Sequence, residues 1–426
     1  MYTKYFIRSS CIFTPLLFLL ISSNNSNKFT NSIFSHVKKI ESINSVSSDM
    51  DLRFIATNNR IIFLGELDHG DSVSDALSLE IIKTLHEKHG FNILIEEIDL
   101  HVANKVYADT LENDIFKSLY KNSINILSIG EYDILNYVQN ERRGYNPLEF
   151  RGIDLMDDSL VIKDLRQFIS SNIVEGQLIT NSKEFMYIDS FYRETIFSKL
   201  AHVKKSKKVE QFSVACKHVI EKIRASKALS ETKKEYWLQE IDNINGYVKW
   251  HWYCKKMSLK KFKDYDLRDE QMARNIIWYL NKIYPTEKII VRVSNFHLTR
   301  HLNKIKNNPR SHENIKSCLN IIKDSIKGSY YTIAFTHYFN HVIANRYEPI
   351  ADTNSVEALL HKHEFKFAFV DLKKAKEAGS NTIFNSYMFL HNSSRVDWAD
   401  VYDGFIYIDK EKTNPHFNMD KTPYCR

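Results

Sequence analysis

Short apolar runs rich in Ile, Val, Phe and Tyr alternate along this chain with stretches of helical periodicity. This alternation is typical of a mostly parallel sheet wound by crossover helices, so we expect an α/β fold with a central sheet flanked by helices. The predicted strands are Ile61–Glu66, Ile93–Glu97, Phe150–Leu155, Ile289–Ser294, Tyr330–Thr336, Phe365–Val370, Asn385–Leu390 and Gly404–Ile408. Between the first two, Leu77, Ile81 and Leu85 recur at helical spacing before Gly90, which predicts a βαβ unit.

Changes in composition and periodicity along the chain predict five segments. Residues 1–27 have a basic start, an apolar centre and a polar exit, which predicts a cleaved secretory signal and hence an exported protein. Residues 28–180 and 263–412 would form the two parts of the α/β core. Residues 181–262, poor in Gly and Pro, predict a helical insertion, and residues 413–426 a tail. The alternative for residues 1–27 is an uncleaved anchor that keeps the protein at the envelope instead of free in the periplasm or outside the cell, but the apolar centre is shorter than the ~20 residues that span a bilayer. No other candidate span follows it.

Charge and glycine usage exclude several protein classes. Removing Lys4 and Arg8 with the signal lowers the net charge from +7 to +5, which is too mild to indicate a nucleic-acid partner. The 11 glycines form no serine-nucleophile elbow, no phosphate-binding loop and no dinucleotide fingerprint. A small-molecule substrate remains the expected partner, and the sequence sets no oligomeric state.

Four cysteines remain after the signal, and their spacing indicates neither a zinc site nor a disulfide scaffold. We expect isolated thiols, although export would permit disulfides. The four are Cys216, Cys254, Cys318 and Cys425.

Ionisable residues follow three of the predicted strands. Glu66 and His69 come after the first strand, Glu96 and Glu97 end the second, and His297 follows the strand Ile289–Ser294. Because parallel strands end at one edge of a sheet, these side chains should meet there. An imidazole that is oriented by a carboxylate is suited to removing a proton from water, so the cluster predicts hydrolysis.

The order and spacing of several motifs resemble the erythromycin esterase family. The resemblance rests on Gly65–Gly70 (G-E-x-x-H-G), His89–Phe91 before the acidic strand end at Glu97, Gly152–Asp154 (G-x-D), Arg268–Asn275 (R-D-x-x-M-A-x-N), Asn295–His297 (N-x-H) and the closing segment Ala399–Asp403. It spans most of the chain and implies hydrolysis of an ester or lactone without a covalent intermediate and without an obligatory metal.

The resemblance also implies roles for individual residues. His69 would be the general base, Glu66 and Glu97 the carboxylates that orient it, and His297 the second imidazole. We choose Glu97 over Glu96 on spacing, since neighbouring strand residues face opposite sides. Substrate-binding roles are predicted for Asp154, Asn295 and Arg268. Alternatively, Asp154 binds backbone amides, and Arg268 forms an ion pair with Asp269 at a helix start.

One departure from the family concerns the substrate. Macrolide-hydrolysing members carry an acid and then a basic residue after the first motif, where this chain has Val73 and Ser78. A cation there would stabilise a developing oxyanion. Arg151, Arg268 or Arg300 are candidates to replace it. Macrolide antibiotics and other esters of the cell envelope or environment therefore both remain candidate substrates.

Two other functions are compatible with the same residues. Glu66, His69, Glu97 and His297 could ligate a divalent metal ion in a metal-dependent hydrolase. A protein that binds haem or metal at the cell envelope without catalysis is the third reading. No cofactor is required by the leading interpretation.

Overall fold

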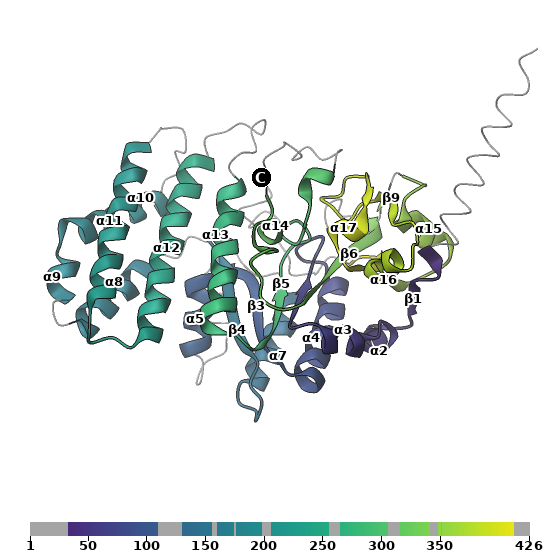
Figure 1. Ribbon diagram of the computed structural model, residues 1–426, viewed down its shortest axis with the longest axis horizontal. Coiled ribbons are helices and arrows are strands. Elements are labelled where there is room, and N and C mark those ends of the chain that lie inside the picture. Colours follow the sequence, from purple (N-terminus) through teal and green to yellow (C-terminus); the bar gives the residue numbers. More distant parts are fainter. Residues whose placement is uncertain are drawn as a thin grey trace, which may run out of the picture.

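The computed structural model describes residues 33–109, 130–155, 160–173, 176–197, 206–254, 265–305, 316–340, 348–350 and 352–412. Its centre is a nine-stranded sheet of order β1-β8-β11-β6-β2-β5-β3-β4, with β7 paired to β6 (Figure 1). The strands are β1 (Val37–Ile40), β2 (Ile61–Leu64), β3 (Phe91–Asp99), β4 (Glu149–Asp154), β5 (Lys288–Arg292), β6 (Tyr330–Asn340), β7 (Glu348–Pro349), β8 (Phe367–Asp371) and β11 (Gly404–Lys410).

The sheet is mostly parallel, as the sequence predicts. All pairs from β11 through β6, β2, β5 and β3 to β4 are parallel, whereas β1, β7 and β8 pair antiparallel. The strand β5 lies between β2 and β3, so these two strands of the predicted βαβ unit are parallel but not adjacent. The ends of β2, β5 and β3 therefore lie next to one another.

Helices cover both faces of the sheet, because alternate strand residues are apolar on both sides. On one face, Ile62, Leu94 and Ile290 pack against the first helices. These are α2 (Val46–Asp49), α3 (Leu52–Asn58), α4 (Ser72–His89), α5 (Leu100–Asp109) and α7 (Gly130–Glu141). On the other face, Phe63 and Val291 pack in a second cluster. Its helices are α13 (Tyr265–Trp278), α14 (Cys318–Ile322), α15 (Val356–Lys362), α16 (Leu372–Glu377) and α17 (Trp398–Val401).

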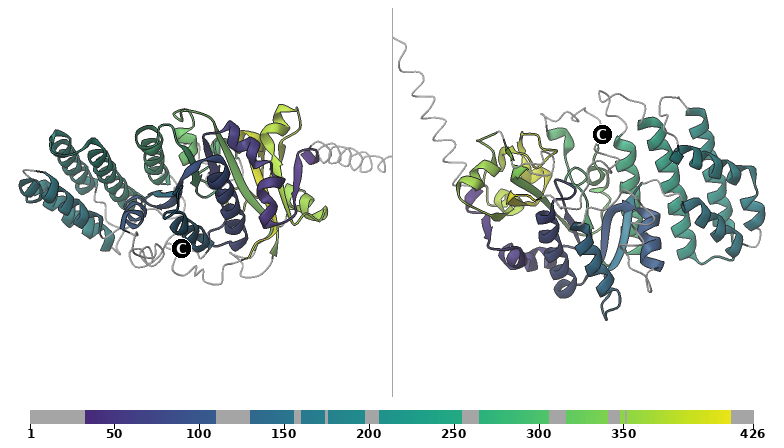
Figure 2. Two further views of the ribbon diagram at one scale, coloured as in Figure 1. Left: turned by 90° about the horizontal axis from the view of Figure 1, so that it is seen from below. Right: turned by 180° about the vertical axis from the view of Figure 1, so that it is seen from behind.

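A stack of helices extends the molecule beyond the β4 edge (Figures 1 and 2). It consists of α8 (Val161–Asn172), α9 (Gly176–Thr180), α10 (Lys183–Phe197), α11 (Ser206–Ala225) and α12 (Glu231–Cys254). A third hydrophobic cluster, which runs from Leu155 to Trp252, holds these helices together. Since α8 belongs to this cluster, the helical part begins before the predicted boundary at residue 181.

Some strands differ from the sequence prediction. The predicted strand Asn385–Leu390 is wrong in its bounds: β9 (Ile383–Ser386) starts and ends earlier, pairs with β10 (Ser394–Asp397) and forms a single bridge from Asn385 to Ser355. The chain turns after Ser386 because Glu357 accepts a hydrogen bond from the Tyr387 amide, and because Leu390 and His391 adopt positive φ angles. The remaining predicted strands are present, and β1, β7 and β10 were not predicted.

Short helical turns complete the fold: η1 (Ile43–Ser45), the π-helical η2 (Tyr279–Ile283) and η3 (Leu302–Lys304). In the described part of the chain, no helix is long and apolar enough to cross a membrane. Cys216 and Cys318 are buried free thiols there. The predicted signal (1–27), the tail (413–426) and Cys425 lie outside the described residues, as does the side chain of Cys254.

Candidate active site

Two glycines shape the loop that follows β2. A Cβ atom on Gly65 would lie 2.1 Å from Asn295 Oδ1, so only glycine allows the Asn295 side chain to pack against the strand end. Gly70 has a φ of 90°, which L side chains rarely adopt. The loop is therefore held close to the end of β5, with Glu66 and His69 between the two glycines.

Glu66 and His69 form a close pair in this loop. Glu66 Oε1 lies 2.5 Å from His69 Nδ1. The Glu66 side chain is 5% exposed, whereas that of His69 is 49% exposed. A carboxylate that accepts from Nδ1 places the lone pair of a neutral imidazole on Nε2. The pair thus presents a half-exposed imidazole in a fixed tautomer.

The buried guanidinium of Arg292 holds the other side of Glu66. Its Nη2 donates to Glu66 Oε2 at 2.7 Å and also to Asp75, while Nη1 donates to Glu96 Oε2 at 3.1 Å. Burial raises the pKa of Asp75 to about 8 and that of Glu96 to about 7, despite the opposing effect of Arg292. For Glu66, burial also raises the pKa, but Arg292 and His69 outweigh it and keep the carboxylate ionised.

Arg292 was missed in the sequence prediction. The signal was present, because Arg292 is the single charged residue in the apolar run Ile289–Val293 and would be costly to bury without acidic partners.

Glu97 is fixed by three donors, of which Ser294 and His297 follow β5 and Arg268 belongs to α13. Its Oε2 accepts from the Ser294 amide at 2.8 Å, and its Oε1 lies 2.7 Å from Arg268 Nη2 and 3.2 Å from His297 Nε2. Burial opposes ionisation, but the two positive partners hold the pKa of Glu97 well below its usual range. Glu96 and Glu97 thus face opposite sides, one toward Arg292 and one toward His297.

His297 lies between two carboxylates and is buried. Its Nδ1 is 2.7 Å from Asp269 Oδ1, which also accepts a hydrogen bond from the Cys318 amide at 2.7 Å. Burial lowers the pKa of His297, but Asp269 and Glu97 raise it to about 9 overall. His297 is therefore an imidazolium at neutral pH. The residues after it form a turn, so it does not cap a helix.

Glu97 lies near the Glu66–His69 pair on one side and contacts His297 on the other. One donor atom each of Glu66, His69 and Glu97 lie within 4.8 Å of one another. The four residues predicted as catalytic, Glu66, His69, Glu97 and His297, are therefore brought together at the ends of β2, β3 and β5. Among the described residues, Glu66, His69 and Glu97 are the ones of this cluster whose donor atoms lie close enough together to share a metal ion.

The three residues predicted to bind substrate are occupied by other contacts. Both carboxylate oxygens of Asp154 pair with Arg268, at 2.8 and 2.6 Å, and Oδ1 also accepts from the Leu155 amide. The Asn295 amide donates to the carbonyls of Phe335 and Met388 and accepts from the Phe335 amide. Arg268 does reach the cluster, through Glu97. Asp154 and Asn295 are buried, and their substrate-binding roles stay predictions.

The other candidate cations lie elsewhere. Arg151 pairs with Glu149 and donates to the Tyr284 hydroxyl, and Arg300 pairs with Asp403. Arg268 therefore has a site contact on the Glu97 side, and Arg292 has one on the Glu66 side.

Comparisons with known proteins agree with this architecture. A family model described as erythromycin esterase matches residues 136–411. YbfO of Bacillus subtilis (strain 168), named as a hydrolase of unspecified substrate, is 24% identical over 419 residues, covering 88% of this chain and 89% of that protein. A crystal structure of a Bacillus cereus protein has a TM-score of 0.72 at 16% identity, covering 92% of this chain and 100% of the other. A variant of the erythromycin esterase EreC in its open conformation has a TM-score of 0.67 at 13% identity, covering 90% and 100%.

Proposed function

Because this chain belongs to the erythromycin esterase family, we propose that it hydrolyses a carboxylic ester or lactone with a water molecule that His69 activates. The observation that carries the proposal is the Glu66–His69 pair, in which a buried, Arg292-bound carboxylate orients a half-exposed imidazole. A general base needs a fixed tautomer and access to water, and this pair supplies both.

The proposed reaction needs no covalent intermediate. His69 Nε2 takes a proton from water while the water oxygen attacks the carbonyl carbon of the ester. The tetrahedral intermediate then collapses, the bond to the alcohol oxygen breaks, and the imidazolium of His69 returns its proton to that oxygen. Glu66 remains ionised throughout and stabilises the transient imidazolium, as carboxylates do in related histidine-based sites.

Arg268 and His297 would place positive charge near the ester carbonyl that His69 and water attack. Arg268 and the His297 imidazolium flank Glu97, which lies within 4.8 Å of the Glu66–His69 donor atoms. Cations that are fixed in a poorly solvated site stabilise a developing oxyanion more than they would in water. We assign Arg268 and His297 this electrostatic role, and Glu97 the role of holding both in place.

We define the proposed substrate only as a carboxylic ester or a lactone. Val73 and Ser78 stand where macrolide-hydrolysing members carry an acid and a cation, yet α4 still presents Asp75 to Arg292. Arg292 therefore supplies a cation next to this helix, hydrogen-bonded to Asp75 rather than to position 73. We propose an exported enzyme whose substrate is a macrolide or another ester met outside the cytoplasm.

The test is hydrolysis of an ester and lactone panel, macrolides included, by the purified protein and by His69→Ala. We expect a loss of about 100-fold to 10,000-fold in kcat/KM for every substrate cleaved. The exposed histidine His218 of α11 provides a matched control, since His218→Ala should keep full activity. Equal activity of His69→Ala and the wild type would refute the assignment.

A metal-dependent hydrolase is the second candidate, favoured by the closeness of the Glu66, His69 and Glu97 donor atoms. In that case a chelator would abolish hydrolysis, and added zinc or manganese would restore it. Activity that survives exhaustive chelation assigns catalysis to His69 and water alone. Failure to cleave any ester, with a ligand-induced rise in Tm, would instead indicate a binding protein.

A further inference from the structure

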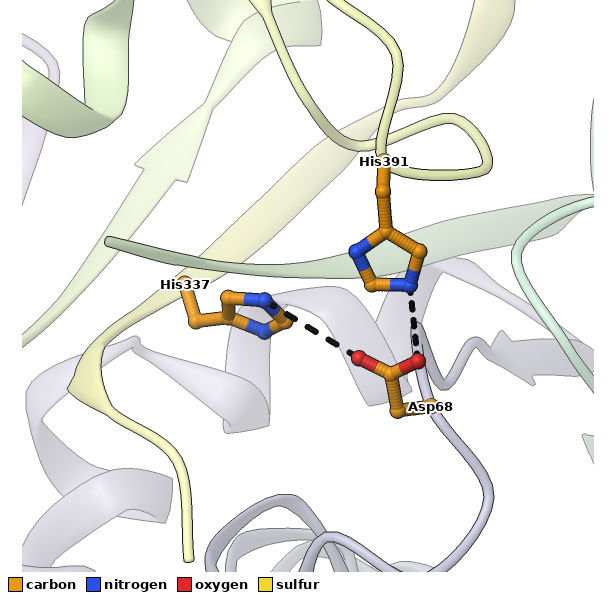
Figure 3. Close-up of side chains that lie close together, drawn as sticks. All are labelled: Asp68, His337 and His391. Atoms are coloured by element: carbon orange, nitrogen blue, oxygen red, sulfur yellow. Dashed lines mark hydrogen bonds and ion pairs between the residues drawn. The ribbon is translucent and has the colours of Figure 1, made fainter. Parts of the chain in front are cut away.

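A second cluster of ligand-type side chains includes Asp68, the neighbour of His69 in the loop that follows β2. We call this loop, residues 65–70, the His69 loop. Asp68 comes from this loop, His337 from the end of β6, and His391 from the turn between β9 and β10 (Figure 3). One donor atom of each lies within 4.8 Å of the others. His391 Nε2 is 2.7 Å from Asp68 Oδ1, and His337 Nε2 is 3.9 Å from Asp68 Oδ2. Three segments that are distant in sequence thus point two imidazoles at one carboxylate.

A fourth ligand-type residue faces the same cluster. The buried carboxylate of Glu411, just after β11, lies 3.2 Å from His337 Nδ1. The set of two imidazoles and one carboxylate is one that zinc and similar divalent ions bind in proteins. With Glu411 and neutral imidazoles the formal charge of the cluster is −2, which a divalent cation would neutralise.

The partners of the Asp68 carboxylate are the two imidazoles and a second acid, Glu411. Its side chain is 9% exposed, and its buried Oδ2 atom accepts no hydrogen bond from a nitrogen donor of the described residues. The ion pairs that the described structure gives it are with imidazoles, not with lysine or arginine. A buried carboxylate oxygen without such a hydrogen bond is costly and calls for an explanation, of which a bound cation is one.

The backbone that carries His391 is strained. Leu390 and His391 have φ angles of 48° and 53°, in the left-handed region that few residues other than Gly, Asn, Asp and His occupy, so that Leu390 is the unusual one. The turn is held in place at Met388, whose carbonyl accepts from Asn295 at 2.9 Å, and at the Tyr387 amide, which donates to Glu357 at 2.9 Å. Such strain persists where the surroundings impose it, and it is common at ligand-binding positions.

We propose that Asp68, His337 and His391 form a binding site for a divalent metal ion of the zinc class, in which Glu411 orients His337 through its Nδ1 atom. Ligand atoms around tetrahedral zinc are about 3.3 Å apart, given bond lengths of about 2.0–2.1 Å. The spacings of 2.7 and 3.9 Å lie on either side of this value, so side-chain rotations suffice to reach it. The ion would join the His69 loop to β6 and to the β9–β10 turn.

This site shares no residue with the Glu66–His69–Glu97 cluster, so the two can be separated by substitution. The wild-type protein is stripped with a chelator and titrated with Zn²⁺ by calorimetry, and its Tm is followed in parallel. We expect one equivalent to bind and the Tm to rise, because an ion that binds only the folded state stabilises it. Cobalt(II) in place of zinc should give visible absorption bands of a four-coordinate site.

The variants locate the ion. His391→Asn should weaken zinc binding at least about 100-fold, whereas His391→Cys, which keeps a zinc ligand, should retain it. His69→Asn should bind zinc as the wild type does. Circular dichroism checks that each variant is folded, and the cobalt spectrum of the wild type tests the site without any variant.

Two results would overturn the proposal: no zinc binding by the stripped wild-type protein, or binding that His69→Asn removes and His391→Asn leaves intact. Ester hydrolysis enters none of these measurements. A failure of the metal proposal would therefore leave the hydrolase proposal standing, and the reverse also holds.

Discussion

At the scale of single residues, the negative charge on Glu66 orients His69 for its proposed role as general base. Arg292 and His69 keep the buried Glu66 carboxylate ionised against the cost of burial. The carboxylate then fixes the imidazole tautomer through the contact of 2.5 Å to Nδ1. A neutral side chain of the same shape would keep the geometry and lose the charge.

Glu66→Gln should therefore lower kcat/KM about 10-fold to 100-fold, the range typical of residues that orient a functional histidine. The matched control is Glu80→Gln on α4, which removes a surface ion pair with Lys83 and should leave the activity unchanged. Steady-state kinetics on the best ester of the panel measures both. Unchanged kinetics in Glu66→Gln would show that the carboxylate is not needed.

Arg292 stands at the centre of three buried acids, so its removal should cost stability as well as activity. Arg292→Met is expected to lower the free energy of unfolding by about 3–5 kcal/mol at pH 7, because it leaves buried carboxylates unpaired. The loss should shrink below pH 6, where Glu96 is protonated in the folded protein as Asp75 already is at pH 7. Denaturant unfolding at both pH values tests this.

The control for this substitution is Arg274→Met, which breaks a half-exposed pair with Asp242 and should cost less than about 1 kcal/mol. Equal costs at positions 292 and 274 would contradict the role given to the buried cluster.

At the scale of helices and strands, the sequence predicted most strands of the sheet and the gathering of ionisable residues at the ends of β2, β3 and β5. Apolar runs and the period of α4 were sufficient for this, because local pattern determines element type. It did not predict that β5 lies between β2 and β3, since strand order depends on contacts between distant residues. Nor did it predict that Asp269 reaches His297, because a pair of charges at a helix start has several partners available.

The close packing of Gly65, just after β2, against the Asn295 side chain leads to a prediction at this scale. Gly65→Ala should lower stability by about 1–3 kcal/mol and also reduce kcat/KM, because the added Cβ would force Asn295 and the neighbouring Glu66 to move. Gly90→Ala is the matched comparison. It has a φ of 71° and no atom within 4 Å of the added Cβ, so it should lose stability but keep its kcat/KM. Retained kcat/KM in Gly65→Ala would show that this packing does not position the site.

At the scale of the whole molecule, the buried cluster links stability to pH. The pKa of His297 rises from 6.5 to about 9 on folding, so its protonation stabilises the fold fully below pH 6.5. This contribution is lost as the pH rises toward 9. Asp75 and Glu96, with pKa values raised to about 8 and about 7, act in the same direction.

The wild-type protein should therefore lose stability between pH 6.5 and 9. His297→Gln should be less stable at pH 6.5 and show a shallower decline over this range, since only Asp75 and Glu96 still titrate. Thermal unfolding of both proteins across the range measures the difference. Parallel curves would mean that His297 does not gain its proton on folding.

The whole molecule also contains a cluster that sequence patterns did not predict. The positions of Glu66, His69, Glu97 and His297 after predicted parallel strands indicated that they meet, and the resemblance to the family implied their roles. The cluster of Asp68, His337 and His391 was not predicted, because its members come from a loop, a strand end and a turn with no fixed spacing. Only the folded arrangement of β2, β6 and the β9–β10 turn brings them within reach of one another.

The central claim, that His69 directs water at the ester carbonyl without a covalent intermediate, is tested most directly by a single turnover in heavy-oxygen water with enzyme in excess over substrate. The account predicts that the acid released in this first turnover carries one heavy oxygen and that the protein carries none. An unlabelled acid together with a heavy oxygen in a protein carboxylate, at Glu66 or Glu97, would contradict it.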